Sequence, residues 1–398
     1  MPAIITKDFR IQNANQFSES FGESADTYYL AIGRPQAFAN DQAFNDGTDT
    51  SPPTPVDSVG SVDYYVYDDL MSAKKITSSN VSAVIPRRNW TTGTTYDYYR
   101  HDYGEINSAG TVIAANSGAT TLHDATFYVM NSTFDVYKVI DNNGNSASTV
   151  EPSGNKTTSV FSTGDSYKWK YMYTLTASEQ ANFMSTDFIH CSTESTDYST
   201  TAGAIEHAKV TAGGSSGTNG TYTNVDIRGD GSSGKATIVI GSNAVTSVTI
   251  TTAGSGYTYA SVKASDIGNV SGADIDFIIS PPGGHATDVI AELGGFFVMM
   301  NVDFATSESG EFNTSNDFRR IALLRNPTDS TTGATATADT LDATKSITFS
   351  GTPGSFQADE KITQASSGAV GYVVDFNSTT KVLRYIQPQF ANQGIDTN

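Results

Sequence analysis

The sequence has little cysteine, little positive charge and no long apolar run. Its 398 residues include a single cysteine, Cys191, which excludes an intramolecular disulfide framework. The longest apolar run, residues 296–302, is strand-sized and falls short of the roughly 18 residues of a membrane span. Charged residues also follow the start too soon for a signal peptide. We therefore expect no membrane partner, and a chain made and kept in a cytoplasm or in an assembly built there.

Acidic side chains outnumber basic ones by 42 to 23, which gives a formal net charge of −19. Nucleic acids and anionic membranes are bound by basic surfaces that displace counterions. We therefore expect neither as a partner. The charge favours solubility and acidic surfaces that guide docking electrostatically.

Only 16% of the residues are charged, whereas Ser, Thr, Asn and Gly fill long stretches and there are 20 Tyr and 20 Phe. This balance predicts short strands joined by turns. The expected fold class is mainly β, with several domains of β-sandwich-like sheets, a few short helices and inserted modules rich in Gly, Ser and Thr. Four regions are predicted. Residues 1–204 form a β-rich N-terminal region, and residues 205–283 form an inserted Gly-rich repeat module. Residues 284–332 return to the N-terminal core, and residues 333–398 form a β-hairpin module with a polar tail.

Local patterns place some elements. Period-two alternation over 167–175 predicts a half-buried strand, and 133–141, apolar on both faces, predicts a more central one. Two alternating strands around the NSTT turn predict a hairpin near the C-terminus. Helical spacing predicts short helices over 10–21, 68–76, 178–185 and 287–293.

The Gly-rich region contains an internal near-repeat. Each copy runs from a glycine just before a Tyr-Thr pair through a strand and a glycine turn to an alternating strand, and Tyr222 and Tyr257 set a period of about 35 residues. Such a unit is typical of a small β-module inserted into a host fold.

Motifs that suggest catalysis are present only as fragments. Residues 229–236, GDGSSGKA, resemble a phosphate-binding loop that includes Lys235, but the hydroxyl residue is missing and a strand follows instead of a helix. Residues 213–217, GGSSG, place Ser215 in a nucleophile-elbow pattern without the required strand and helix. The five histidines show no ligand spacing. We therefore expect no enzyme activity, no catalytic residue, no metal and no cofactor; a hydrolase that uses Ser215 or Lys235 is the third alternative.

One segment is more specific. Residues 82–90, SAVIPRRNW, combine an apolar strand end, a proline, the pair Arg87 and Arg88, and Trp90. Adjacent arginines at a strand exit can bind carboxylates or backbone carbonyl groups, although ordinary surface charge explains them equally well.

This segment resembles the baseplate wedge proteins of contractile-tail phages of the T-even type, in the family of gene product eight. Four further segments resemble the family in the same order: Tyr28–Pro35, Pro52–Ser58, Tyr167–Leu175 and Asp317–Pro327. The family's closing segment is not found, which leaves the completeness of the C-terminus open.

The resemblance implies a structural protein of the virion tail baseplate, assembled in the host cytoplasm, that forms a homodimer of mainly β subunits and contacts other wedge proteins. It makes Arg87, Arg88 and Trp90 candidates for an interface or a structural clamp, with Arg319 and Arg320 as secondary candidates. The alternative is a carbohydrate-binding tail adhesin, in which exposed Tyr222 and Tyr257 stack on sugars. Against that alternative, large aromatic residues more often fill a core.

Overall fold

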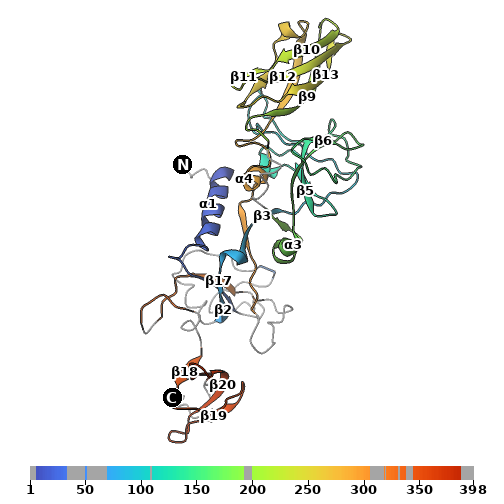
Figure 1. Ribbon diagram of the computed structural model, residues 1–398. Helices are drawn as coiled ribbons and strands as arrows, with labels where there is room; N and C mark the ends of the chain where they lie inside the picture. The colour runs from blue at the N-terminus through green and yellow to red at the C-terminus, as the bar shows by residue number, and fades with distance from the viewer. Residues whose placement is uncertain are drawn as a thin grey trace. The chain divides into compact units, whose positions relative to one another are not determined.

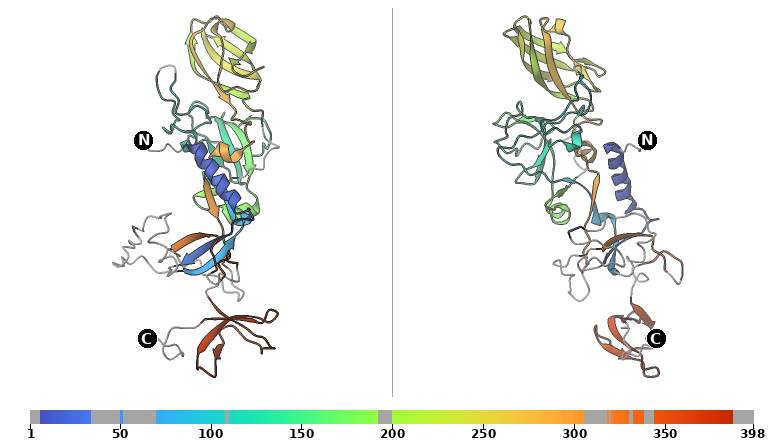
Figure 2. Two further views of the ribbon diagram at one scale, coloured as in Figure 1. Left: turned by 90° about the vertical axis from the view of Figure 1, so that its left-hand side faces the viewer. Right: turned by 180° about the vertical axis from the view of Figure 1, so that it is seen from behind.

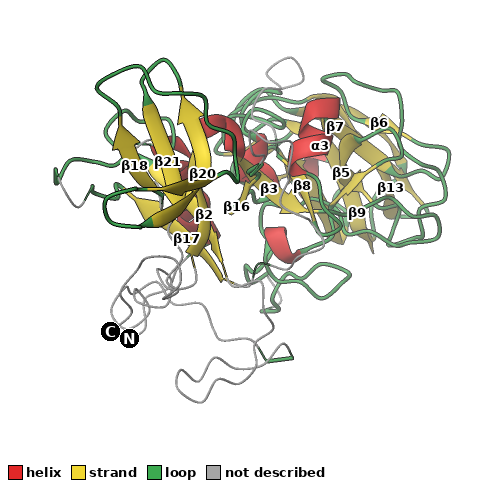
Figure 3. Cartoon of the chain, turned by 90° about the horizontal axis from the view of Figure 1, so that it is seen from below, coloured by secondary structure: helices red, strands yellow, loops and turns green. Residues whose placement is uncertain are grey.

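The computed structural model describes residues 6–33, 50–51, 70–107, 110–191, 200–304, 318, 320–329, 332–337 and 344–386. Strands dominate these residues and pair into small antiparallel sheets, with a few helices between them (Figures 1 and 3). The chain therefore has the mainly β fold that its composition predicts. Within the described residues, no helix combines the length and the apolar character that crossing a membrane requires.

The chain divides into two compact units. The first comprises Met1–Glu23 and Thr77–Asp303, and the second comprises Ser24–Ile76 and Phe304–Asn398. The predicted repeat module lies wholly in the first unit. The second unit instead combines parts of the other three predicted regions, because its strands come from both ends of the chain.

The first unit begins with helix α1, Lys7–Ser20. The Thr6 side chain caps it by accepting a hydrogen bond from the Phe9 N–H at 3.2 Å, as is usual for a helix start. Its buried residues are Ile11 and Ala14. The helix packs beside β3 and β16, which Figure 2 shows.

Two sheets form the body of the first unit. One contains β16-β3-β8, which span Phe297–Met300, Val81–Pro86 and Phe188–His190. The other contains β4-β5-β7-β6, which span Tyr128–Met130, Asp135–Asp141, Lys168–Thr174 and Phe161–Ser162.

The second of these sheets is buried on both faces. Val136, Ile140 and Met172 belong to the main apolar core of the unit, whereas Tyr137 and Trp169 belong to a separate aromatic cluster. The central strand predicted over 133–141 is confirmed as β5. The prediction that 167–175 is only half-buried is wrong, because β7 is covered on both sides.

Two short helices follow the predicted positions closely. Helix α3 spans Ala177–Phe183 and helix α4 spans Val289–Leu293, and they are capped by Thr176 and Asp288. Short 3-10 turns span Ser78–Asn80, Leu122–Asp124 and Ala264–Asp266. The helix predicted over 68–76 is wrong: residues 70–76 form strand β2, because pairing with a neighbouring strand outweighs their helical spacing.

The inserted module encloses a core of its own between two sheets. One sheet pairs β9 with β15, and the other has the order β10-β12-β13, while the short strands β11 and β14 pair separately. In chain order from β9 to β15 these strands span Ile205–Ser215, Gly220–Asp226, Arg228–Gly229, Lys235–Gly241, Ala244–Thr252, Ala260–Ser261 and Ser271–Ile279.

The tyrosine of the second repeat packs against the glycine turn of the first. Tyr257 is only 3% exposed, and its hydroxyl donates to the Ile227 carbonyl at 3.0 Å and accepts from the Gly234 N–H at 3.1 Å. A Cβ at Gly231 would lie 2.4 Å from the Tyr257 ring. The glycines of the GDGSSG tract therefore make room for an aromatic ring, and the tract lies between strands rather than before a helix.

The tyrosine of the first repeat makes the reciprocal contact. The Tyr222 hydroxyl donates to the Thr218 carbonyl at 2.9 Å, and a Cβ at Gly268, in the glycine turn of the second repeat, would lie 2.2 Å from the same hydroxyl. Gly268 has a φ of +71°, which also favours glycine. Each copy of the repeat thus accommodates the tyrosine of the other.

The second unit contains two further sheets. The first has the order β17-β1-β2, which span Arg320–Arg325, Tyr28–Gly33 and Leu70–Ile76. The second has the order β18-β21-β20-β19, which span Lys345–Thr348, Val382–Ile386, Val370–Asn377 and Lys361–Thr363. The pairing of β20 with β21 confirms the hairpin predicted around the NSTT turn.

Candidate functional site

Arg87 follows the last residue of β3 and binds the chain segment before β8. Its backbone N–H donates to the Asp187 carbonyl at 2.7 Å. Its guanidinium donates to the Ser185 carbonyl at 2.9 Å and to the Asn89 side chain at 3.0 Å. The side chain thus fixes two neighbouring loops of the same subunit.

Arg88 reaches the opposite side of the strand exit. Its guanidinium donates to the Ala125 carbonyl and lies 4.6 Å from the centroid of the Tyr128 ring, within cation–π range. The Tyr128 hydroxyl in turn donates to the Pro86 carbonyl at 2.8 Å. Both arginines therefore bind main-chain carbonyl oxygens, which is the geometry of a clamp within one subunit. A role for them in an interface remains a prediction.

Trp90 extends this clamp to the aromatic cluster, against which its ring packs. Its indole N–H donates to the Ser148 hydroxyl at 3.1 Å, and that hydroxyl donates to Asp165 at 3.1 Å. Burial opposes ionisation of Asp165, but hydrogen bonds led by the one from Thr163 lower its pKa below the usual value. The carboxylate is thereby kept charged and ordered behind the clamp.

A second cluster of ionisable groups lies in the interior of the first unit. Lys138 on β5 and Lys170 on β7 are directly opposite each other, and both side chains are fully buried. The Lys138 ammonium contacts the buried carboxylate of Glu292 on α4 and the Nδ1 of His285, and it lies 4.1 Å from the centroid of the Tyr99 ring. Of the two buried lysines, Lys138 is therefore paired with a carboxylate inside the core.

Burial also shifts the pKa values of three other groups in the cluster. Burial lowers the pKa of Lys170 to about 8, and its ammonium donates to the Thr157 carbonyl at 3.1 Å. Burial raises the pKa of Glu206, which lies at the base of β9. Burial and the neighbouring Lys138 charge hold the pKa of His285 well below its usual value, so its ring is neutral and its Nδ1 accepts a hydrogen bond.

The cluster lies where the inserted module leaves the core of the first unit and returns to it. Thr200, before the module, donates its N–H to the His285 carbonyl at 3.0 Å and accepts the His285 N–H on its hydroxyl at 2.9 Å. Glu292 accepts the Ala286 N–H at 2.7 Å. Both connecting segments are therefore tied to each other and to α4.

Charged contacts also join the base of the module to the core. Arg100 binds Asp102 with two hydrogen bonds of 2.8 Å and contacts Asp276 on β15. His207 on β9 lies 2.8 Å from Asp141 on β5. Burial would raise the pKa of Asp141, but the hydrogen bond from His207 and nearby positive charge lower it. The module is thus fastened by ion pairs as well as by its two connections.

Sequence reasoning missed this cluster. The alternating pattern of β7 placed Lys168 and Lys170 on an expected solvent face, whereas Lys170 faces a core. His285 lies in the turn before α4, and its burial had no signal in the sequence. The convergence of Lys138 and Lys170 from two strands with His285 from a turn could be recognised only from the fold.

The remaining candidate residues are placed as follows. Arg319 lies outside the described residues, and Arg320 is described only as the first residue of β17. Tyr222 is half-buried. Tyr257 fills the core of the module, so its ring cannot stack on a sugar in this structure, and the role predicted for it in the adhesin alternative is corrected to a core role.

The catalytic fragments also have structural roles. Ser215 ends β9, and Lys235 begins β12 and contacts Asp226 across the β10–β12 pair. Residues 228–230 are held within the module, because Arg228 pairs with Asp266 at 2.7 Å and Asp230 accepts a hydrogen bond from the Thr258 N–H. Among the described residues, no group of three or more His, Cys, Asp or Glu residues is arranged to hold a metal ion.

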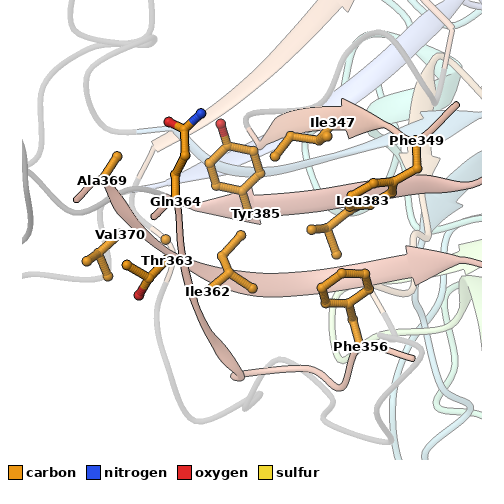
Figure 4. Close-up of a pocket in the computed structure, with 11 residues that line it drawn as sticks. Ile347, Phe349, Phe356, Ile362, Thr363, Gln364, Ala369, Val370, Leu383 and Tyr385 are labelled. Atoms are coloured by element: carbon orange, nitrogen blue, oxygen red, sulfur yellow. The ribbon is translucent and has the colours of Figure 1, made fainter. Parts of the chain in front are cut away.

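The C-terminal sheet carries an apolar groove of about 620 Å³. Figure 4 shows Ile362, Leu383 and Phe356 projecting into it, with the polar residues Thr363 and Gln364 near one end. Phe356 also packs against Phe349 and Phe376, so a cluster of three partly buried aromatic rings adjoins the groove.

Two comparisons with known proteins agree on one family. The model of the family described as "Bacteriophage T4, Gp8" matches residues 3–149. A relative, baseplate wedge protein gp8 of Enterobacteria phage T4, is 33% identical over 91 residues, which make up 22% of this chain and 26% of the relative. The chain thus matches about a quarter of the length of that relative.

The family match includes three of the five segments that carry the resemblance: Tyr28–Pro35, Pro52–Ser58 and Ser82–Trp90. Of these, 52–58 and the end of the first segment lie outside the described residues. The segments 167–175 and 317–327 lie beyond the matched residues, so their resemblance stays a prediction. Residues 3–149 therefore match the family of the phage T4 protein Gp8, and part of the chain resembles a baseplate wedge protein of that phage.

Proposed function

We propose that this protein is a structural component of a contractile phage tail baseplate, and specifically that it holds neighbouring wedge proteins together as a homodimer. The single observation that carries the proposal is the match of residues 3–149 to the Gp8 family, together with the identity shared with a baseplate wedge protein. The virion tail baseplate is the corresponding location, with assembly in the host cytoplasm.

The architecture supports a role in holding partners. A subunit that transmits position between neighbours must keep its loops and inserted parts fixed. Arg87 and Arg88 fix the exits of β3, and the Lys138–Glu292 pair with its neighbours fixes the base of the inserted module. The proposed mechanism is therefore binding geometry, with an apolar centre at each interface and acidic rims that steer docking.

No catalytic role is proposed, since each catalytic fragment in the sequence has a structural explanation. The carbohydrate-binding alternative loses its main support with the burial of Tyr257. Wedge proteins of the same phage are therefore the proposed partners, with no nucleic acid or membrane among them.

The test is the mass of the purified chain by light scattering, alone and after co-expression with the other tail proteins of its phage. The expected result is a species of twice 42.2 kDa that moves into a larger defined complex with baseplate proteins. A capsid protein of the same phage serves as the control partner and should leave the mass unchanged. A chain whose mass stays the same in the presence of the tail proteins would contradict the proposal.

A further inference from the structure

The sheet β17-β1-β2 has two edges of different character. In its central row, Ala31 of β1 lies opposite Ala322 of β17 on one side and Ala73 of β2 on the other. The next row places Ile32 between Ile321 and Ser72. Residues at equivalent positions on the two edges can therefore be compared directly.

The β2 edge is protected by charge. Lys74 and Lys75 are both exposed, and lysines on an edge strand discourage pairing with another strand. The register of β2 is also irregular beside Ile32 and Gly33, which is typical of edges that avoid pairing.

The β17 edge has the opposite character. Ile321 is 65% exposed and Leu323 is 37% exposed, and as alternate residues of a strand they share one face. Within the described part of the chain, β17 pairs only with β1. An exposed edge that carries an apolar stripe is a template for strand addition.

We propose that two copies of this chain associate by antiparallel pairing of β17 with β17 of the second copy, about a two-fold axis at Ala322. In this register, Ile321 lies opposite Leu323 of the second copy, and Leu323 lies opposite Ile321 of the second copy. The apolar stripe of Ile321 and Leu323 therefore packs against the same stripe of the second copy, as a two-fold interface requires. Centring the axis on Leu323 instead would place Ile321 opposite Arg325, an apolar residue against a charged one.

Charge favours the same edge. Each copy carries a net charge of −19, which opposes self-association over most of the surface. Residues 318–327 contain three arginines and no acidic residue. Arg325 also binds Asp26 of its own subunit through two hydrogen bonds of 3.1 and 2.9 Å. Two acidic subunits can therefore approach at β17 with less repulsion. The inference rests on the homodimer of the proposed function and specifies its surface.

A disulfide across the two-fold axis tests the pairing. Ala322→Cys places two thiols opposite each other across the axis, whereas Ala73→Cys places a thiol in the same row on the β2 edge. The native Cys191 is buried and does not interfere. Under mild oxidation, Ala322→Cys is expected to form a covalent dimer on a non-reducing gel and Ala73→Cys to stay monomeric. No covalent dimer from Ala322→Cys, or equal amounts from both variants, would overturn the proposal.

A second pair of variants separates this inference from the proposed function. Ile321→Lys is expected to shift the light-scattering mass from dimer to monomer, whereas Ser72→Lys, in the same row on the other edge, leaves the dimer intact. A wild-type monomer would remove the homodimer itself. A dimer that survives Ile321→Lys would keep the homodimer and reject β17 as its interface. If Ile321→Lys fails to fold by circular dichroism, the cysteine pair decides.

Discussion

The hydroxyl of Tyr257 accepts a hydrogen bond from the Gly234 N–H at 3.1 Å, although the two residues belong to different copies of the sequence repeat. The ring occupies space that glycine turns of the other copy leave open, and Tyr222 contacts Gly268 in the reciprocal way. A glycine tract that resembles a nucleotide-binding loop in sequence is therefore explained by packing.

Gly231→Ala is expected to destabilise the protein by about 1–3 kcal/mol or more, because the new Cβ would lie 2.4 Å from the Tyr257 ring and overlap the core. Gly220→Ala is the matched control in the same repeat, since its Cβ would make only an ordinary contact of 3.6 Å with Tyr222. Thermal unfolding of both variants checks the prediction. Equal melting temperatures for the two would contradict the packing role of the tract.

Lys138→Met is expected to cost about 3–5 kcal/mol of unfolding free energy, because it leaves the Glu292 carboxylate buried without its counter-charge. Adding Glu292→Gln removes that charge and keeps an acceptor for the Ala286 N–H. The double variant should therefore regain much of the loss. Urea denaturation of the single and double variants measures the difference, and a double variant no more stable than the single one would argue against the ion pair.

The pH dependence of stability should reveal Lys170. Its folded-state pKa is about 8, whereas an unfolded lysine titrates near 10.5, so the unfolded state binds more protons between these values. Stability of the wild type relative to Lys170→Met is therefore expected to rise as the pH increases from 8 to 10, by up to about 1.4 kcal/mol per pH unit. Denaturant titrations at several pH values check the sign, and a flat difference would mean that Lys170 titrates normally.

Arg88→Ala is expected to lower the unfolding free energy by about 1–3 kcal/mol, because it removes a charged hydrogen bond to the Ala125 carbonyl and the contact with the Tyr128 ring. Arg88→Lys keeps the charge but not the planar group, so we expect a partial loss. An Arg88→Ala variant as stable as the wild type would show that the clamp is dispensable.

Charge reversal of both Arg87 and Arg88 to Glu is expected to block incorporation into wedges. The control changes both residues to Gln, which removes the same positive charges without introducing negative ones. Incorporation is measured by co-purification with tail proteins. A block seen only for the Glu variant, with its circular dichroism and melting temperature equal to those of the Gln variant, would assign the arginines to an interface. A block accompanied by a lower melting temperature would assign them to the fold. Normal assembly of the Glu variant would remove them from the interface.

Sequence patterns predicted the parts of the fold that depend on neighbouring residues. Strand β5, the C-terminal hairpin and the approximate positions of helices α1, α3 and α4 follow from periodicity. Strand β2 was not predicted, because residues 70–76 have helical spacing and become a strand only by pairing with β1. Local propensity is weak against such pairing.

The candidate sites divide in the same way. The position of Arg87, Arg88 and Trp90 at a strand exit was visible in the sequence, but their partners were not. The two arginines donate to the carbonyl groups of residues 185 and 125, and the Trp90 indole donates to the Ser148 hydroxyl. Lys138 and Lys170 face each other only because two strands align in one register. Such contacts depend on the topology of the sheet, which the local pattern does not contain.

The reciprocal packing of Tyr222 and Tyr257 constrains how the inserted module could have arisen and how it can change. In one copy alone, the tyrosine would lack the glycine turn against which it packs, and the glycine turn would lack the tyrosine that fills it. A single-copy ancestor is therefore expected to have paired two identical chains until a duplication joined the two copies in one chain. Deletion of a single copy should be lost by selection, whereas removal of the whole insert leaves no unmatched half behind.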